Sequence, residues 1–263
     1  DEEVSRGLGD VYKRQSALYA RNTQTVDELL ISSEVIAGVG HDLGKSSDRF
    51  PADRISTYPH DEHLIINLRA TNQLGLFAQA YVHDQDWASR TERIGDRQNL
   101  SRYQSQTYGA LFSHQHTNET STNRWGIELT ARTNVDIAEI ETPLGGDSIN
   151  VGLVDGGNER VSGVFADRML FLGDTTLRVG GRLDQSQVSN DGSSRSETKL
   201  NGQVQIDTRL RSDWLFAAEL GTAYRLPTLS ELYFSGETPR GTVQGNSLCL
   251  LYTSDAADDG IRV

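Results

Sequence analysis

The sequence predicts an all-β fold: a partial antiparallel transmembrane β-barrel, with about nine strands of a larger up-and-down barrel. Three observations favour this class: apolar and polar residues alternate with a period of two, short and long connections alternate along the chain, and tryptophans mark strand ends. The clearest alternation covers Lys199–Leu210. Successive side chains of a β-strand point to opposite faces, so this segment has one largely apolar and one polar face.

The remaining strands are predicted in the same way. Turn signals separate the alternating segments, which together give about nine strands. Clear alternation covers 73–83, 125–132, 177–184, 199–210 and 214–224; weaker alternation covers 62–71, 102–114 and 160–171; a short first strand is expected near 17–22.

Short turns and long loops largely alternate between these strands. Transmembrane barrels join their strands by short turns on the periplasmic side and by longer loops outside. This rhythm therefore orients the strands, with their apolar faces toward lipid. Short turns are predicted at 72–73, 173–174 and 211–213, long loops at 23–61, 88–101, 142–158 and 188–195, and a connection of intermediate length at 116–123.

The same orientation assigns positions to the tryptophans and to the charges of the clearest strand. Trp125 and Trp214 are expected at the periplasmic rim and Trp87 near the outer rim, as in the aromatic girdles of membrane barrels. Lys199 and Asp207, together with Arg209, are expected to face the lumen. The alternative for the tryptophans is the core of a soluble β-sandwich.

Composition excludes several classes of protein. The 263 residues carry a net charge of -12 and 24% charged residues, with a mean hydropathy of -0.51. These values exclude a helical membrane protein, and the acidic balance argues against nucleic acid as a partner. Cys249 is the only cysteine, so a disulfide within the chain is impossible.

Residues 1–15 and 249–263 are expected to be non-native. The first of these ends contains Asp-Val-Tyr-Lys-Arg-Gln, which resembles a translated transposase adapter from sequencing libraries, and Cys249–Asp259 resembles the opposing adapter. No signal peptide is visible, although a protein of this class must be exported. We therefore expect residues 16–248 to be an internal fragment of a longer gene.

Other motifs give no prediction of catalysis or of a cofactor. Gly38–Ser46 has Val39 where a phosphate-binding loop needs glycine. The histidine pairs, His60 with His63 and His114 with His116, lack the further ligands of a metal site, so polar lumen or loop positions are favoured. Asp84 and Asp86 share a face that is interpreted as solvated. Because a nucleophile motif is also lacking, the sequence predicts neither an enzyme nor a metal site.

The segment 224–236 carries the family information. It reads Tyr-Arg-Leu-Pro-Thr-Leu-Ser-Glu-Leu-Tyr-Phe-Ser-Gly and is expected to end a strand and enter a loop, because proline cannot donate to a sheet ladder. It resembles the TonB-dependent outer-membrane receptor family, whose C-terminal half carries aromatic-Arg-x-Pro-[ST]-Leu-x-Glu-Leu-Tyr followed by Gly-Asn. The family's next element, Pro-x-Leu-x-Pro-Glu, is absent, because the adapter-like end begins just after Leu248. The matching positions are Tyr224, Arg225, Pro227, Leu229, Glu231, Leu232, Tyr233, Gly245 and Asn246.

The resemblance implies a monomeric receptor in the outer membrane of a Gram-negative bacterium. Its barrel of about 22 strands would be closed by an N-terminal plug, through which the TonB complex supplies energy for nutrient uptake. Plug and TonB box are expected to lie outside this chain. About nine strands leave two open edges in lipid, at several kcal/mol for each unsatisfied backbone group, so the fragment alone is expected not to form a stable pore.

Ligand capture is expected in the outer loops and upper lumen. Arginines beside aromatic rings suit anionic, ring-bearing metal chelates, and a ferric siderophore is the preferred class. Each arginine has an alternative, which is to pair with an acidic residue or to line a polar lumen. For the whole protein the alternatives are a passive porin-like barrel, a soluble β-rich binding domain and an outer-membrane enzyme. The candidate ligand contacts are Arg225, Arg240, Tyr233 and Arg102.

Overall fold

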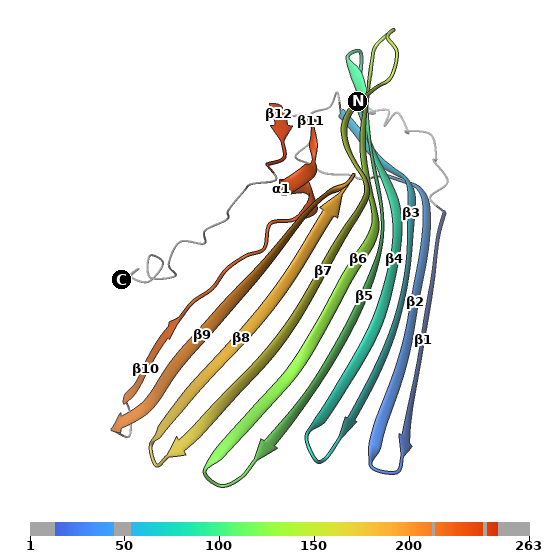
Figure 1. Ribbon diagram of the computed structural model, residues 1–263. Coiled ribbons are helices and arrows are strands. Elements are labelled where there is room, and N and C mark those ends of the chain that lie inside the picture. Colours follow the sequence, from blue (N-terminus) through green and yellow to red (C-terminus); the bar gives the residue numbers. More distant parts are fainter. Residues whose placement is uncertain (1–13, 45–53, 212–213, 239–240, 247–263) are drawn as a thin grey trace, which may run out of the picture.

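The computed structural model describes residues 14–44, 54–211, 214–238 and 241–246. Ten strands, β1–β10, lie in the sheet in the order of the sequence, each antiparallel to its neighbours (Figure 1). A five-residue helix, α1, and a small hairpin, β11–β12, follow them. The bounds are β1 Arg14–Val26, β2 Leu29–Gly44, β3 Arg54–Asn72, β4 Leu76–Arg93, β5 Arg97–Thr117, β6 Ser121–Pro143, β7 Ile149–Leu172, β8 Thr175–Asn190, β9 Ser193–Arg211, β10 Trp214–Gly221, α1 Leu229–Tyr233, β11 Ser235–Thr238 and β12 Gly241–Gln244.

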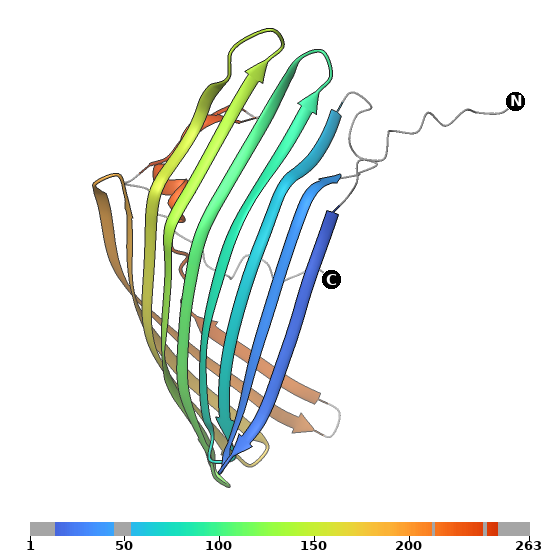
Figure 2. The same cartoon turned by 90° about the vertical axis from the view of Figure 1, so that its right-hand side faces the viewer.

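The sheet curves into part of a barrel wall that stays open between β1 and β10 (Figures 1 and 2). The concave face, which carries α1, is called the inner face below, and the convex face is called the outer face. The all-β, partial up-and-down barrel predicted from the sequence is confirmed, with ten wall strands in place of nine. Within the described residues, α1 is too short and too polar to cross a membrane as a helix.

The long loop predicted at 23–61 is wrong. Its first residues end β1, and residues 29–44 form β2, which is joined to β1 by the two-residue turn Asp27-Glu28. Alternation did not reveal β2 because both of its faces carry large apolar side chains: Leu30 and Ile36 point to one side, Ile31 and Val35 to the other. The first strand is also longer than predicted.

The other predicted long loops are mostly paired strand. The ladder between β4 and β5 continues to Arg93 and Arg97, and β8 joins β9 through Asp191-Gly192 alone. Both residues of that turn have positive φ, 45° and 75°, as a tight hairpin turn requires. The end of the wall that carries these turns, the upper end in Figure 1, is therefore built of extended hairpins. At the lower end, the predicted short turn at 173–174 is confirmed, and the turn predicted at 72–73 lies at 73–75. The connection predicted at 116–123 is shorter and covers 118–120 only, and residues 212–213 of the last predicted turn lie outside the described residues.

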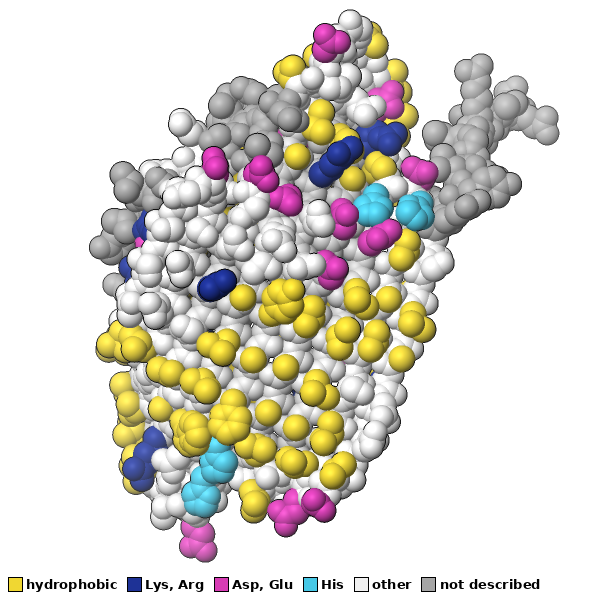
Figure 3. Space-filling model, turned by 45° about the vertical axis from the view of Figure 1, so that its right-hand side comes forward, with side chains coloured by type: hydrophobic (Ala, Val, Ile, Leu, Met, Phe, Trp, Pro, Cys, Tyr) yellow, Lys and Arg dark blue, Asp and Glu magenta, His cyan; other side chains and the backbone are white. Residues whose placement is uncertain are grey.

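Strand pairing carries one row of apolar side chains across the outer face. On each strand, every second residue above and below this row also points outward. Figure 3 shows the apolar side chains gathered over this part of the wall, with charged groups above and at the lower edge. On β8 the apolar outward run is Leu177–Leu183, about 20 Å at ~3.4 Å per residue, close to the ~25 Å apolar band of a membrane barrel. The row consists of Ala78, Phe112, Ile127, Val164, Leu183 and Leu200.

The face assignment made for Lys199–Leu210 is confirmed. Leu200 belongs to the outer row, while Lys199 pairs with Asp184, which is buried under the segment that crosses the inner face. The alternation is equally clear on β8, where the outward Leu183, Gln185 and Gln187 are exposed and the intervening inward residues are buried.

The tryptophan positions are confirmed only in part. Trp125 lies near the lower end on the outer face, 5.7 Å between ring centroids from Phe112. Trp87 lies in the upper part of β4, but it stacks on Tyr103 at 5.5 Å on the inner face. Trp87 shares the inward parity of His83, so it cannot contribute to a girdle facing lipid.

Candidate functional site on the inner wall

The inner wall is lined by paired charges from three neighbouring strands. Arg124 Nε of β6 donates to Asp167 Oδ2 of β7 at 2.7 Å, and Arg178 Nη2 of β8 donates to Asp167 Oδ1 at 3.2 Å. Higher on the wall, Arg182 Nη1 of β8 donates to Glu128 Oε2 of β6 at 2.7 Å. These pairs make the inner face polar while neutralising much of its charge.

One of these networks fixes the segment that follows β10. Arg182 Nε donates to Asp184 at 2.8 Å, and the Tyr224 hydroxyl donates to the same carboxylate at 2.6 Å. Asp184 is only 5% exposed, so both donors compensate a buried charge. Tyr224, the first residue of the family motif, is therefore attached to the barrel wall.

Helix α1 begins with a capping box. The Glu231 backbone N–H donates to Thr228 Oγ1 at 3.3 Å, and the Thr228 backbone N–H donates to Glu231 Oε2 at 2.8 Å. Arg225 donates to both carboxylate oxygens of Glu231, at 2.6 and 2.9 Å. The Arg225 guanidinium, followed by the Thr228 backbone N–H, lowers the pKa of Glu231 to about 2.

The apolar side of α1 packs on the inner wall. Leu229 and Leu232 are buried against Val135 of β6 and Val188 of β8. Tyr233 packs on the same cluster, and its hydroxyl donates to the Val188 carbonyl at 3.4 Å. Truncation of a buried leucine costs about 2–5 kcal/mol, so this cluster provides much of the attachment.

Two glycines permit the close packing of α1. A Cβ at Gly157 of β7 would lie 3.1 Å from Leu229 Cδ2, and a Cβ at Gly245 would lie 2.7 Å from the Tyr233 nitrogen. The Gly245 N–H donates to the Phe234 carbonyl, and the Asn246 N–H donates to the Glu231 carbonyl at 3.0 Å. The Gly-Asn pair thus returns to the helix. The described residues of the segment 224–246 form one unit, which we call the motif unit.

The structure brings together two of the four candidate ligand contacts. Arg225 and Tyr233 belong to the motif unit. Arg102 lies on the outer face of β5, in a hollow shared with His60 and Asp86. Arg240 lies outside the described residues.

Sequence reasoning missed both the helix and its anchors. A signal for α1 was present, because Thr228 and Glu231 have the spacing of a capping box. The anchors Asp184 and Arg182 carry no local signal, since Asp184 lies 40 residues from Tyr224 in the chain.

The histidines divide between the two faces. On the inner face His63 Nδ1 lies 3.2 Å from His83 Nε2, and His63 Nε2 lies 2.8 Å from Asp61. On the outer face His60 lies 3.5 Å from Asp86. Across the described ranges, no group of three or more His, Cys, Asp or Glu residues could hold a metal ion.

Fold and site together define the class: part of the wall of a membrane-type up-and-down β-barrel, with a motif unit docked inside it. The family model described as TonB dependent receptor-like, beta-barrel, matches residues 7–254, and the chain belongs to this family. A search of curated proteins finds no match.

Solved structures show the same fold. The copper transporter OprC is similar over 84% of this chain and 38% of its own, with 14% identity and a TM-score of 0.63. The FrpB iron transporter from Neisseria meningitidis (F3-3 variant) is similar over 82% of this chain and 38% of its own, with 18% identity and a TM-score of 0.55. The chain therefore spans well under half the length of these proteins. The assignment of residues 1–15 and 249–263 to adapter sequence stays a prediction.

Proposed function

We propose that this chain is part of the wall of an outer-membrane receptor that imports a metal chelate, with a ferric siderophore as the preferred ligand class. Membership of the TonB-dependent receptor family supports a receptor role. The similar solved proteins are described as copper and iron transporters, which supports a metal-containing cargo. Energy would come from the TonB complex through a plug encoded elsewhere in the gene.

The observation that carries the proposal is the docked motif unit. It lies on the inner wall toward the end with the extended hairpins. It ties β6 and β8 together through a buried apolar cluster and the Tyr224–Asp184 bond, and β11 pairs with β7. A barrel wall that only encloses a passive pore needs no such unit. A receptor needs a fixed surface inside the barrel against which its ligand and its plug can be positioned.

We propose Arg225 and Tyr233 as ligand contacts on this surface, and Arg240, which lies outside the described residues, as a further ligand contact. Arg225 keeps half of its side chain exposed although Glu231 holds it. Arg102 faces away from the lumen, so it is left out of the proposed set.

The test uses the complete gene, expressed in a bacterial host whose own iron receptors are deleted. Uptake of iron-55 on a panel of siderophores is measured with and without TonB and a proton uncoupler. Uptake of at least one chelate that stops without TonB is the expected result. Uptake that persists without TonB would indicate a passive pore and refute the proposal.

Sequencing the source DNA across both ends tests the assignment of the termini. Receptor sequence is expected to continue where residues 1–15 and 249–263 now stand. If those residues are encoded in the genome, the adapter interpretation is wrong.

A further inference from the structure

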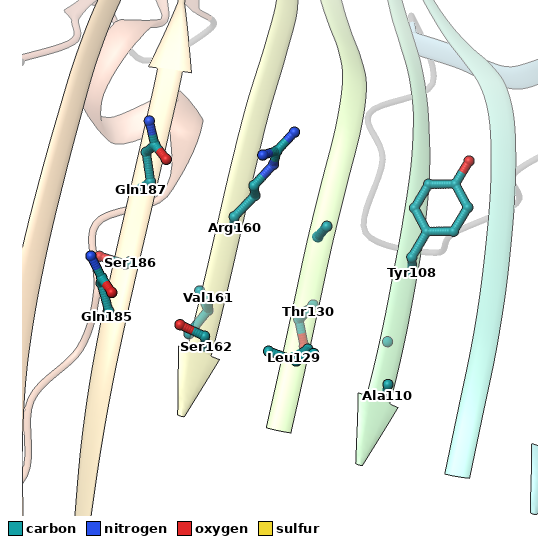
Figure 4. Close-up of a pocket in the computed structure, with 12 residues that line it drawn as sticks. Tyr108, Ala110, Leu129, Thr130, Arg160, Val161, Ser162, Gln185, Ser186 and Gln187 are labelled. Carbon is teal, nitrogen blue, oxygen red and sulfur yellow. The ribbon is translucent and has the colours of Figure 1, made fainter. Parts of the chain in front are cut away.

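The outer wall has a hollow at the upper edge of its apolar band, over β5–β8 (Figure 4). Its volume is about 440 Å³. Each of four adjacent strands contributes two residues at outward positions and the one residue between them, and α1 lies behind the sheet in this view. The hollow therefore opens away from the lumen, toward the surroundings of the barrel.

Strand pairing explains how the hollow forms. Its upper row, from β5 to β8, is Tyr108, Ala131, Arg160 and Gln187, each directly opposite the next. The small Ala131 stands between the large Tyr108 and Arg160 side chains and leaves a gap between them. The shape of the hollow is therefore determined by the side chains of paired strands and does not depend on a loop.

The row below is partly apolar and the row below that is fully apolar. Ala110 and Leu129 are followed by Ser162 and Gln185 in the second row. The third row is part of the apolar band, from Phe112 to Leu183. Polarity therefore rises from the band to the upper row, as it does from the acyl chains to the headgroups of a membrane.

Arg160 carries the only charge among the side chains lining the hollow. It is exposed, and within the described part of the chain it forms no ion pair. The Gln187 amide lies opposite it on β8, and the Gln185 amide lies one row lower, opposite Ser162 (Figure 4). A cation with neutral donors around it, directly above an apolar floor, complements a phosphate joined to acyl chains.

We propose that this hollow binds an anionic membrane lipid, with its phosphate on Arg160 and Gln187 and one acyl chain over Ala131 and Leu129. The occupant is a lipid of the surrounding leaflet whose phosphate gives the headgroup a net negative charge. This inference rests on the proposed membrane location but requires neither ligand nor TonB.

The test measures lipid retained by the complete receptor in native mass spectrometry. The purified receptor is exchanged into a detergent containing equal amounts of phosphatidic acid and phosphatidylcholine. Preferential retention of phosphatidic acid is expected, and Arg160→Gln is expected to lower it roughly tenfold or more, because a charge-assisted contact is lost. Ala131→Leu, which fills the gap and keeps the charge, is expected to lower it as well.

Arg168→Gln is the matched control, because Arg168 is an exposed, outward-facing arginine of the same strand near the lower edge of the band. Its retention should equal that of the unmodified receptor. Equal retention of the two lipids, equal effects of the two arginine changes, or a receptor dimer that carries no lipid would each overturn the proposal. Since uptake is not measured, failure here and failure of the transport proposal are distinguishable.

Discussion

The pairing of Arg225 with Glu231 predicts how the motif unit responds to loss of one charge. Both partners are partly exposed, at 51% and 36%, so we expect the bidentate pair to contribute about 1 kcal/mol to holding α1 closed. Arg225→Ala and Glu231→Gln should therefore each accelerate hydrogen exchange of the α1 amides about fivefold. Glutamine can still accept the Thr228 N–H, so this change removes the charge and keeps the cap.

The assay is hydrogen–deuterium exchange of the peptide that covers α1, in the complete receptor. The double variant should exchange no faster than either single variant, because each removes the same interaction. Glu231→Ala also loses the capping bond, which adds about 1 kcal/mol and brings the acceleration to roughly thirtyfold. Arg97→Ala, at the turn between β4 and β5, is the control and should leave α1 unchanged. Additive effects of the two single changes would refute the pairing as the source of the protection.

The same two variants separate ligand contact from support of the helix. If Arg225 binds the chelate directly, Arg225→Ala weakens ligand affinity while Glu231→Gln keeps or strengthens it, because the Glu231 carboxylate no longer competes with the ligand for the guanidinium. If Arg225 only supports α1, both variants weaken affinity equally. Equal losses would therefore remove Arg225 from the proposed ligand contacts.

Three further predictions concern packing, pH and the two faces of the wall. Gly245→Ala should open α1 roughly tenfold more often in the exchange assay, because its Cβ would collide with the backbone of Leu232, and unchanged exchange would contradict the observed packing. In the folded protein the pKa of Glu231 is about 2, below its usual value of 4.5, so the stabilisation of α1 by Glu231 should be complete above about pH 4.5 and be lost as the pH falls toward 2. Protease protection measured over a pH series should show this step, and the Glu231→Gln variant should lack it. Val204→Lys, on the outer face, should lower the free energy of unfolding in urea by about 2–4 kcal/mol, whereas Gln203→Lys, on the inner face, should change it by less than about 0.5 kcal/mol. Equal effects of the two changes would contradict the face assignment.

The period of two was sufficient to predict most of the wall. On β9 it placed Leu200 and Lys199 on opposite faces, and the pairing with β8 confirms this. It failed on β2, where Ile36 faces inward beside Tyr19 and Ile65, so that both faces carry large apolar side chains. Alternation of apolar and polar residues therefore indicates a strand only where the two faces of that strand contact different surroundings.

The motif unit was predictable in its residues and not in its contacts. Tyr224 and Glu231 could be singled out because they belong to a family signature. Their partners Asp184 and Arg225 have different origins: Arg225 is local, while Asp184 reaches the motif only after β8 and β10 take their places in the sheet. Contacts across a barrel depend on strand register, which a single strand's sequence does not determine.

The register of β7 and β8 also links the outer hollow to the inner surface that carries the motif unit. Gln187 lines the outer hollow, and its neighbour Val188 belongs to the cluster that holds α1 on the inner face. Arg160 and Glu159 are divided in the same way, the first toward the hollow and the second toward Arg132 on the inner wall. A slip of one residue in β8 would turn Gln187 inward and Val188 outward and so disturb both surfaces at once, whereas a slip in β7 would turn Arg160 inward and Glu159 outward. The proposed lipid contact and the docking of the motif unit therefore require the same register of β8, so a register change in β8 that damages one surface must damage the other.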